Sequence, residues 1–456
     1  MKLDETLTQQ ERTVLEKGST LSPSPTLSRP SQRTPFISLI FFLSLVSLLL
    51  IIFTSLFVSN LAGLTKVRAT VALPSLQALG GKTLQKLVLP ADQELFYAGT
   101  SFIFSVPTAG GAPRILDTPG YRYNRSTPPL LLPDGRLVYG GTGIWLFDPG
   151  TGQRQQLASI ADGDVLTSLV TSSDGTQLAW SSAPIGRSGK IEVYAGPLTQ
   201  GKRIYQQVAS QCPCFRAFSY ANSSAGQANS ILLLTNDRSD HRLVQYGLWA
   251  LDLTQSTQPY QILQDAPQQG PLAYVQAQNL LLSSSYEGFV PLPTDRSAPG
   301  DMSSFSYANS LTFSSLNGTP LQSQNAQTFL AEQGNLSNSA VYHWVTSPFF
   351  SPDGKQLAYV EFSSDSHDPF TRHSALYIEQ VEQNAVTKST AGRGHGPGLV
   401  ATSTSRYVEL GGWLDEHTLL FYADNALYAF DLQQGALTQI VSPGAYVKII
   451  GVGKKR

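Results

Sequence analysis

Two cysteines separated by one proline are the most conspicuous pair of potentially reactive side chains in the sequence. They are Cys212 and Cys214, and the chain of 456 residues has no other cysteine. Two thiols at this spacing can form an exchangeable disulfide or supply two soft ligands to a metal. The pair is not a Cys-x-x-Cys motif, and the nearest histidine along the chain is His241. We therefore predict a structural disulfide or two unreactive thiols in a loop, with a redox pair as the alternative.

Two other segments contain residue types that bind metals or phosphates. Asp365, His367, Asp368 and His373 offer oxygen and nitrogen ligands within nine residues. They fall between two expected strands, where a solvated hairpin loop is the favoured interpretation. The glycine-rich residues 392–398 have no preceding strand, following helix or P-loop lysine, so they do not match a nucleotide site. The sequence thus predicts no catalytic residue, no metal site and no cofactor.

The composition excludes general nucleic-acid binding and favours β-structure. Lys and Arg number 31 against 32 Asp and Glu, so no excess of basic charge is present to neutralise phosphates. Charged residues make up 14 % of the chain, against about 25 % in typical soluble domains. Uncharged polar residues and glycine replace them, and these residues suit turns and strands better than helices.

Residues 36–58 predict one transmembrane helix. This run is apolar, no charge occurs between Arg33 and Lys66, and a helix of this length spans roughly 30 Å. A cleaved signal peptide has a shorter apolar core, so we expect an uncleaved signal anchor. Residues 1–35 are expected to be a disordered cytoplasmic tail and 59–83 a linker. The predicted location is the cell membrane, with the C-terminal domain on its extracytoplasmic side.

A turn followed by a strand recurs along the rest of the chain. Residues 351–359 read SPDGKQLAY, residues 172–180 read SSDGTQLAW, and residues 132–139 read LPDGRLVY. Residues 414–422 are a degenerate fourth copy. Gly after Asp supplies the tight turn because Gly adopts positive φ readily, and Leu-x-Tyr places two apolar groups on one strand face.

An aromatic strand follows each copy, and its spacing predicts the fold. The aligned positions are Ile103, Trp145, Tyr194, Trp249, Tyr377 and Tyr428. Four of the five intervals lie near the roughly 40 to 50 residues of a propeller blade, and the fifth is about twice as long. We therefore expect an all-β β-propeller over residues 84–452, with seven blades and with six or eight as the alternative counts. The hidden blade would occupy about 270–342, and residues 287–340 would be an insertion.

Closure of the ring requires the two ends of this domain to meet. Residues 446–452 and 84–89 both read as strands. We expect them to complete one blade together, since this removes exposed strand edges.

The SPDG-type repeat resembles the blade motif of TolB-like (WD-repeat-like) propellers. It also resembles the propeller part of prolyl-oligopeptidase relatives, but the chain has no Gly-x-Ser-x-Gly nucleophile motif for their hydrolase domain. The resemblance implies a bacterial-style propeller on a membrane anchor. It implies no functional residues, because the motif is a folding signature.

These observations favour a non-enzymatic, membrane-anchored binding or scaffolding module. Its partner would be a protein, peptide or glycan at one face of the ring, with the 287–340 insertion as the expected contact surface. The alternative is an enzyme, such as a lyase, cyclotransferase or hydrolase, with its site in the central funnel. That function needs carboxylates or histidines that converge on the innermost strands.

Overall fold

The computed structural model describes most of the C-terminal part of the chain. The described residues are 85–124, 126–185, 189–210, 214–223, 226–236, 246–254, 258–264, 269–289, 307–318, 320–329, 341–365, 372–382, 385–386, 399–400, 408–423, 426–434, 436–441 and 448–454. All belong to the unit Ala72–Arg456. The expected tail, transmembrane helix and linker lie outside them. No helix in the described part is both long and apolar enough to cross a membrane.

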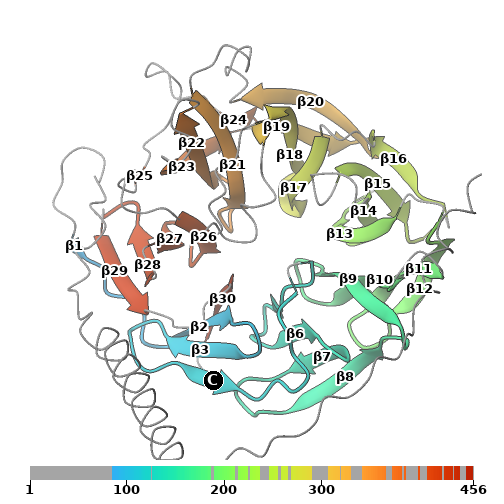
Figure 1. Cartoon of the computed structure of the whole chain (residues 1–456), viewed down its shortest axis with the longest axis horizontal. Coiled ribbons are helices and arrows are strands. Elements are labelled where there is room, and N and C mark those ends of the chain that lie inside the picture. The colour runs from blue at the N-terminus through green and yellow to red at the C-terminus, as the bar shows by residue number, and fades with distance from the viewer. Residues whose placement is uncertain are drawn as a thin grey trace, which may run out of the picture. The chain divides into compact units, whose positions relative to one another are not determined.

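The described strands pair into seven sheets of four or five strands, which Figure 1 shows around a central axis. The first four sheets in ring order, each from its innermost strand outwards, are as follows. The first sheet has β30 (Lys448–Lys454), β2 (Gln93–Ala98), β3 (Ile103–Pro107) and β4 (Arg114–Leu116), and the second has β5 (Leu130–Leu131), β6 (Leu137–Gly140), β7 (Gly143–Phe147) and β8 (Arg154–Ser159). The third sheet has β9 (Asp164–Thr171), β10 (Gln177–Pro184), β11 (Lys190–Pro197) and β12 (Lys202–Val208). The fourth has β13 (Phe215–Ala221), β14 (Ile231–Asn236), β15 (Tyr246–Asp252) and β16 (Tyr260–Leu263).

The other three sheets complete the ring. They are β17 (Gln269–Val275), β18 (Leu280–Phe289), β19 (Tyr307–Asn317) and β20 (Gln322–Phe329); β21 (Val341–Phe350), β22 (Gln356–Asp365), β23 (Arg372–Glu382) and β24 (Ala385–Val386), with β25 (Leu399–Val400) also on β23; β26 (Val408–Trp413), β27 (Thr418–Ala423), β28 (Ala426–Asp431), β29 (Ala436–Val441) and β1 (Gln85–Lys86). One short 3-10 helix, η1 (Gln276–Gln278), joins β17 to β18. The expected all-β propeller class is confirmed.

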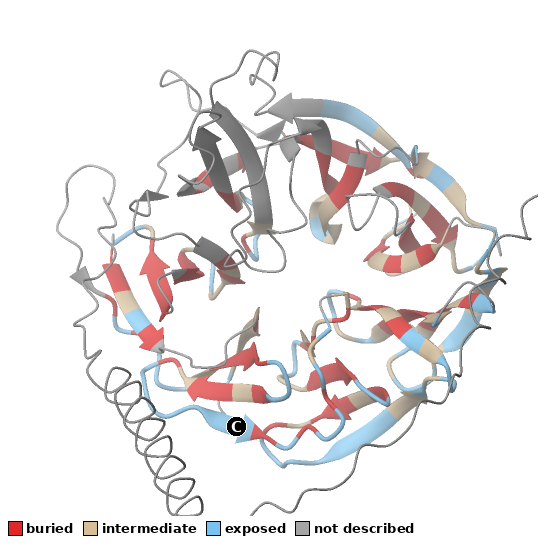
Figure 2. Cartoon of the chain, viewed as in Figure 1, coloured by how far each residue is buried: buried red, intermediate tan, exposed pale blue. Residues whose placement is uncertain are grey.

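Buried apolar clusters lie between neighbouring sheets at six places around the described ring, so the middle strands there are buried on both faces. All residues of β6, β14 and β28 are buried, whereas most of β8 is exposed. Figure 2 shows this gradient from the buried middle of the blades to the exposed outer strand β8. Burial on both faces explains the continuous apolar runs that the sequence places after each turn.

An aromatic residue on the third strand faces the second strand in every one of these sheets. The seven opposed pairs are Tyr97–Phe104, Tyr139–Trp145, Trp180–Tyr194, Leu234–Trp249, Leu282–Phe313, Tyr359–Tyr377 and Phe421–Tyr428. The rings of Trp180 and Tyr194 stack with centroids 4.8 Å apart. Five of the six aligned sequence positions are therefore structurally equivalent. The sixth is Phe104 rather than Ile103, and Phe313 marks the hidden blade.

The hidden blade changes the interpretation of residues 287–340. Tyr307–Asn317 and Gln322–Phe329 are its third and fourth strands, so this part of the expected insertion belongs to a blade. Residues 287–289 are the end of β18, and 290–306, 319 and 330–340 lie outside the described residues.

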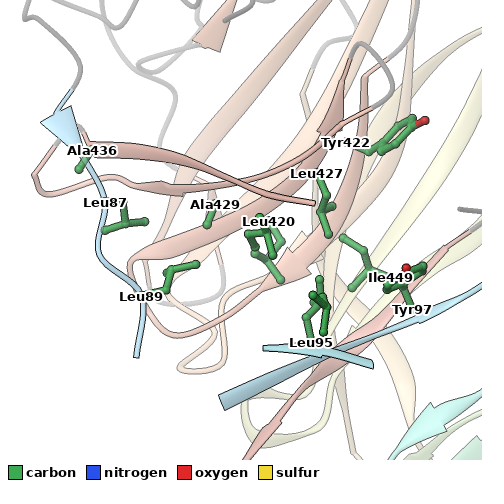
Figure 3. Packing of buried hydrophobic residues seen from close by; sticks show 12 residues of the cluster. Leu87, Leu89, Leu95, Tyr97, Leu420, Tyr422, Leu427, Ala429, Ala436 and Ile449 are labelled. Atoms are coloured by element: carbon green, nitrogen blue, oxygen red, sulfur yellow. The ribbon is translucent and has the colours of Figure 1, made fainter. Parts of the chain in front are cut away.

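The two ends of the domain close the ring in a different way from the predicted one. β30 pairs antiparallel with β2 and supplies the innermost strand of that blade, as expected for residues 446–452. The prediction for residues 84–89 is wrong, because β1 pairs in parallel with β29 in the preceding blade. The reason is packing: Leu87 and Leu89, just after β1, are buried against side chains of both blades (Figure 3). A strand in that place covers an open sheet edge and fills the last interface between blades.

Candidate functional site

The turns between the first and second strands of the blades gather on one face of the ring, because all the innermost strands run in the same direction. We call them the inner turns. In the described part of the chain they lie at 132–136, 172–176, 222–223 with 226–230, 276–279, 351–355 and 414–417. The blade built from β30 and β2 has no such turn, since these strands come from opposite ends of the domain.

The SPDG-type sequence forms a turn that is closed by its own side chains. In the turn at 351–355 the Ser351 hydroxyl donates to Asp353 Oδ1 over 2.6 Å and accepts the Gln356 backbone N–H at 2.9 Å. Asp353 Oδ1 also accepts the Lys355 backbone N–H at 3.0 Å. Gly354 has φ +71°, a conformation that favours Gly. Ser, Asp and Gly therefore each stabilise this turn.

The turn at 172–176 repeats this pattern. The Ser172 hydroxyl donates to Asp174 Oδ1 and accepts the Gln177 N–H. The Thr176 N–H and hydroxyl donate to the same carboxylate oxygen at 3.0 and 2.9 Å. Gly175 has φ +70°. The recurrent motif of the sequence is therefore the same structure in two blades.

Hydrogen bonds connect neighbouring inner turns across three blades, with Gln276 at their centre. Its amide Nε2 lies 2.7 Å from both Asn222 Oδ1 and Asn229 Oδ1, and its Oε1 accepts the Ser173 hydroxyl at 3.0 Å. Asn229 in turn donates to Asp174 Oδ2 over 3.2 Å. These half-buried amides hold three turns in fixed relative positions, so the polar groups of these three turns are preorganised.

A pocket of about 470 Å³ opens between the turns at 132–136 and 172–176. It is lined by Leu132, Pro133, Asp134, Arg136, Asp174, Gly175, Thr176 and Leu198. A Cβ on Gly175 would lie 2.7 Å from Cδ of Pro133, so only Gly allows the two turns to approach this closely. The pocket therefore depends on the turn motif on one side and on the neighbouring blade on the other.

Both carboxylates of the pocket already accept hydrogen bonds. Asp134 Oδ2 lies 2.7 Å from Arg136 Nη2, and its Oδ1 accepts the Arg136 backbone N–H at 3.0 Å. The pKa of Asp174 is lowered overall. Partial burial by itself would raise this pKa, but the hydrogen bonds from Ser172, Thr176 and Asn229 outweigh that effect. The pKa of Asp353 is also lowered, chiefly by the Ser351 hydroxyl. A carboxylate with a lowered pKa is a weak base and a good acceptor, which suits binding more than proton transfer.

The sequence-predicted candidates lie elsewhere. Cys214 is in a disulfide, and its N–H donates to Asn236 Oδ1 at 2.8 Å. Cys212, the other cysteine, lies outside the described residues, so the predicted pair stays a prediction. Asp365 ends β22 and His373 lies in β23, while His367 and Asp368 are outside the described residues. Where the structure is described, it brings no three metal-binding side chains together.

Sequence reasoning identified the turn at 172–176 as a folding repeat and missed its pocket. The available signal was the residue after Gly, which is Lys355 in one copy and Thr176 in the other. The Gln276 contacts carried no signal, since their partners are far apart along the chain.

No family model matches the chain, and no curated protein matches its sequence. Solved structures match at low identity. A proposed 6-phosphogluconolactonase of Bacteroides fragilis shares 13 % identity and a TM-score of 0.45, over 79 % of this chain and 98 % of that one. An oligogalacturonate lyase of Vibrio parahaemolyticus shares 10 % identity with a TM-score of 0.42, over 80 % of this chain and 90 % of that one. A proposed TolB protein of Agrobacterium tumefaciens shares 15 % identity with a TM-score of 0.33, over 69 % of this chain and 92 % of that one. A TolB-like structure is thus among the similar ones, but such values say nothing about activity.

Proposed function

We propose that this chain is a non-enzymatic binding or scaffolding module, a seven-bladed propeller held on the extracytoplasmic side of a membrane by residues 36–58. Its partner is a protein or peptide, or a glycan, bound at the face of the inner turns. The anchor rests on the uncharged apolar run in the sequence. The sequence alone favoured residues 287–340 as the contact surface. The inner turns replace them because their groups are preorganised and border a pocket.

The observation that carries this proposal is the state of the polar groups on that face. Asp174 is a charged acceptor with a lowered pKa, and the amides of Gln276, Asn222 and Asn229 beside it are held by one another. A preorganised set of donors and acceptors lowers the entropy cost of binding a partner. The same groups are poor proton acceptors near neutral pH.

Site-specific photo-crosslinking of the full chain in the cells that produce it tests this function. A photo-reactive amino acid at Ala277, exposed on the inner turn 276–279, is compared with one at Gln155, exposed on the outer strand β8. We expect a discrete adduct from position 277 and none from position 155. Equal labelling at both positions, or none at either, would contradict the proposal.

The enzyme alternative makes a different prediction in a parallel experiment. The purified full chain would turn over a lactone or an oligosaccharide, and substitution of Asp164 on the innermost strand β9 would abolish that turnover. Such a result would replace the binding function by catalysis in the funnel.

A further inference from the structure

The two carboxylates of the pocket differ in how their charge is balanced. Asp134 has a cation of its own, the Arg136 guanidinium. Asp174 accepts hydrogen bonds from Ser172, Thr176 and Asn229, all of which are neutral. No ion pair with Asp174 occurs within the described part of the chain. Two carboxylates and one guanidinium leave the pocket with one net negative charge, centred on Asp174.

The lining residues other than the charged ones, Thr176 and Gly175 are apolar. They are Leu132, Pro133 and Leu198. Long cationic side chains bury their methylene stems on such surfaces and keep the charged end at a polar group. An anionic ligand would meet an uncompensated carboxylate here. A sugar ring usually stacks on an aromatic side chain, and the eight lining residues include none.

The equivalent turn in another blade shows what this pocket lacks. Asp353 occupies the position of Asp174, and Lys355 occupies the position of Thr176. The Lys355 ammonium lies 3.4 Å from Asp353 Oδ2 and so supplies a cation from within the turn. In the turn at 172–176, Thr176 leaves that place without a positive charge.

We propose that the pocket binds a lysine or arginine side chain of a protein or peptide partner. The charged end lies at Asp174, and the methylene stem lies against Leu132, Pro133 and Leu198. This inference rests on the proposed binding function and specifies the partner chemistry at the pocket between the turns 132–136 and 172–176. A charge-assisted hydrogen bond at Asp174 supplies the discrimination between cationic and neutral side chains.

Fluorescence anisotropy with the purified full chain and four labelled peptides tests the proposal. The peptides are nine-residue Gly-Ser sequences with a central lysine, arginine, norleucine or citrulline. The last two keep the stem and remove the charge. We expect the lysine and arginine peptides to bind about 10-fold or more tightly than their neutral counterparts. Equal binding of charged and neutral peptides would overturn the proposal.

Exchange of residues between the two turns provides matched variants. Thr176→Lys gives the pocket the self-neutralised pattern of the other turn, and Asp174→Asn removes the charge. Both substitutions should weaken binding of the lysine peptide about 10-fold or more. Lys355→Thr and Asp353→Asn make similar changes outside the pocket and should leave binding unchanged. If Asp174→Asn unfolds the chain, Thr176→Lys still decides the question, because Lys is already tolerated at that place in the other turn.

The outcomes separate the two proposals. Loss of binding in Lys355→Thr as large as in Thr176→Lys, or unchanged binding in Thr176→Lys, would refute the cation pocket. If an adduct still forms at Ala277 in that case, the binding function stands with a different ligand chemistry. Absence of both peptide binding and the adduct would refute the proposed function as well.

Discussion

The turns at 172–176 and 351–355 have the same internal hydrogen bonds but different surroundings. In both, a Ser hydroxyl and the next backbone N–H groups close on an Asp carboxylate. One turn faces a pocket and a network of amides, and the other carries its own Lys. The repeat therefore determines the turn, and the residues outside the repeat determine what the turn can bind. Function in this propeller is to be sought where copies of the motif diverge.

The largest difference between the two turns is expected from their glycines. Gly175→Ala places a Cβ against the rigid ring of Pro133 in addition to the strain of positive φ. We expect a loss of about 2 to 3 kcal/mol in the free energy of unfolding. Gly354→Ala meets the flexible side chain of Gln278, so about 1 to 2 kcal/mol is expected.

Denaturant unfolding of the full chain, followed by tryptophan fluorescence, measures both glycine variants. Equal losses would mean that Pro133 moves aside and that the two turns are not held closely together. The contact between Gly175 and Pro133 would then not distinguish the turn at 172–176 from the turn at 351–355.

A smaller difference is expected from the two glutamines of η1. Gln276 bonds with Ser173, Asn222 and Asn229, whereas Gln278 donates once, to the Asp353 carbonyl at 3.2 Å. Gln276→Ala should cost about 1 to 2 kcal/mol of stability and Gln278→Ala about 0.5 kcal/mol. Thermal unfolding of the two variants, side by side, checks the order. A reversed order would show that the amide network does not stabilise the inner turns.

The smallest effect is a dependence of stability on pH. The folded-state pKa values of Asp174 and Asp353 are lowered, so each contributes stability that is complete above the unfolded pKa of about 4 and is lost as the pH falls through the folded value. Asp174→Asn and Asp353→Asn should each flatten the fall in Tm between pH 5 and pH 3. Parallel curves for the wild type and both variants would contradict these shifts.

The sequence predicted the propeller because its local signals agree with the fold. Asp-Gly turns, followed by Leu-x-Tyr strands, recur at nearly constant spacing, and each acts within a few residues. The repeat was not recognisable in the blade around Phe313, because residues Gln276–Asn279 replace the Asp-Gly turn there. The two-residue strand β1 was assigned to the wrong blade, since so short a strand has almost no periodicity.

The candidate site was less predictable than the fold for a physical reason. The pocket is formed by two turns from different blades together with Leu198, and the amide network joins residues from three blades. Such contacts depend on how the blades pack against each other and leave no local pattern. The Cys212–Cys214 motif was conspicuous in the sequence, yet Cys214 is not among the residues of the pocket.

The two closures of the ring differ in how they would respond to tension. β30 is joined to β2 by six residue pairs in antiparallel register, whereas β1 meets β29 through two pairs in parallel register. A pull on the chain at Gln85 acts first on this short strand and on the side chains of Leu87 and Leu89. The weaker attachment would therefore yield before the stronger one, and the released segment would lengthen while the ring stays closed. Under tension from the N-terminal side, β1 is therefore expected to detach before any strand of the closed ring.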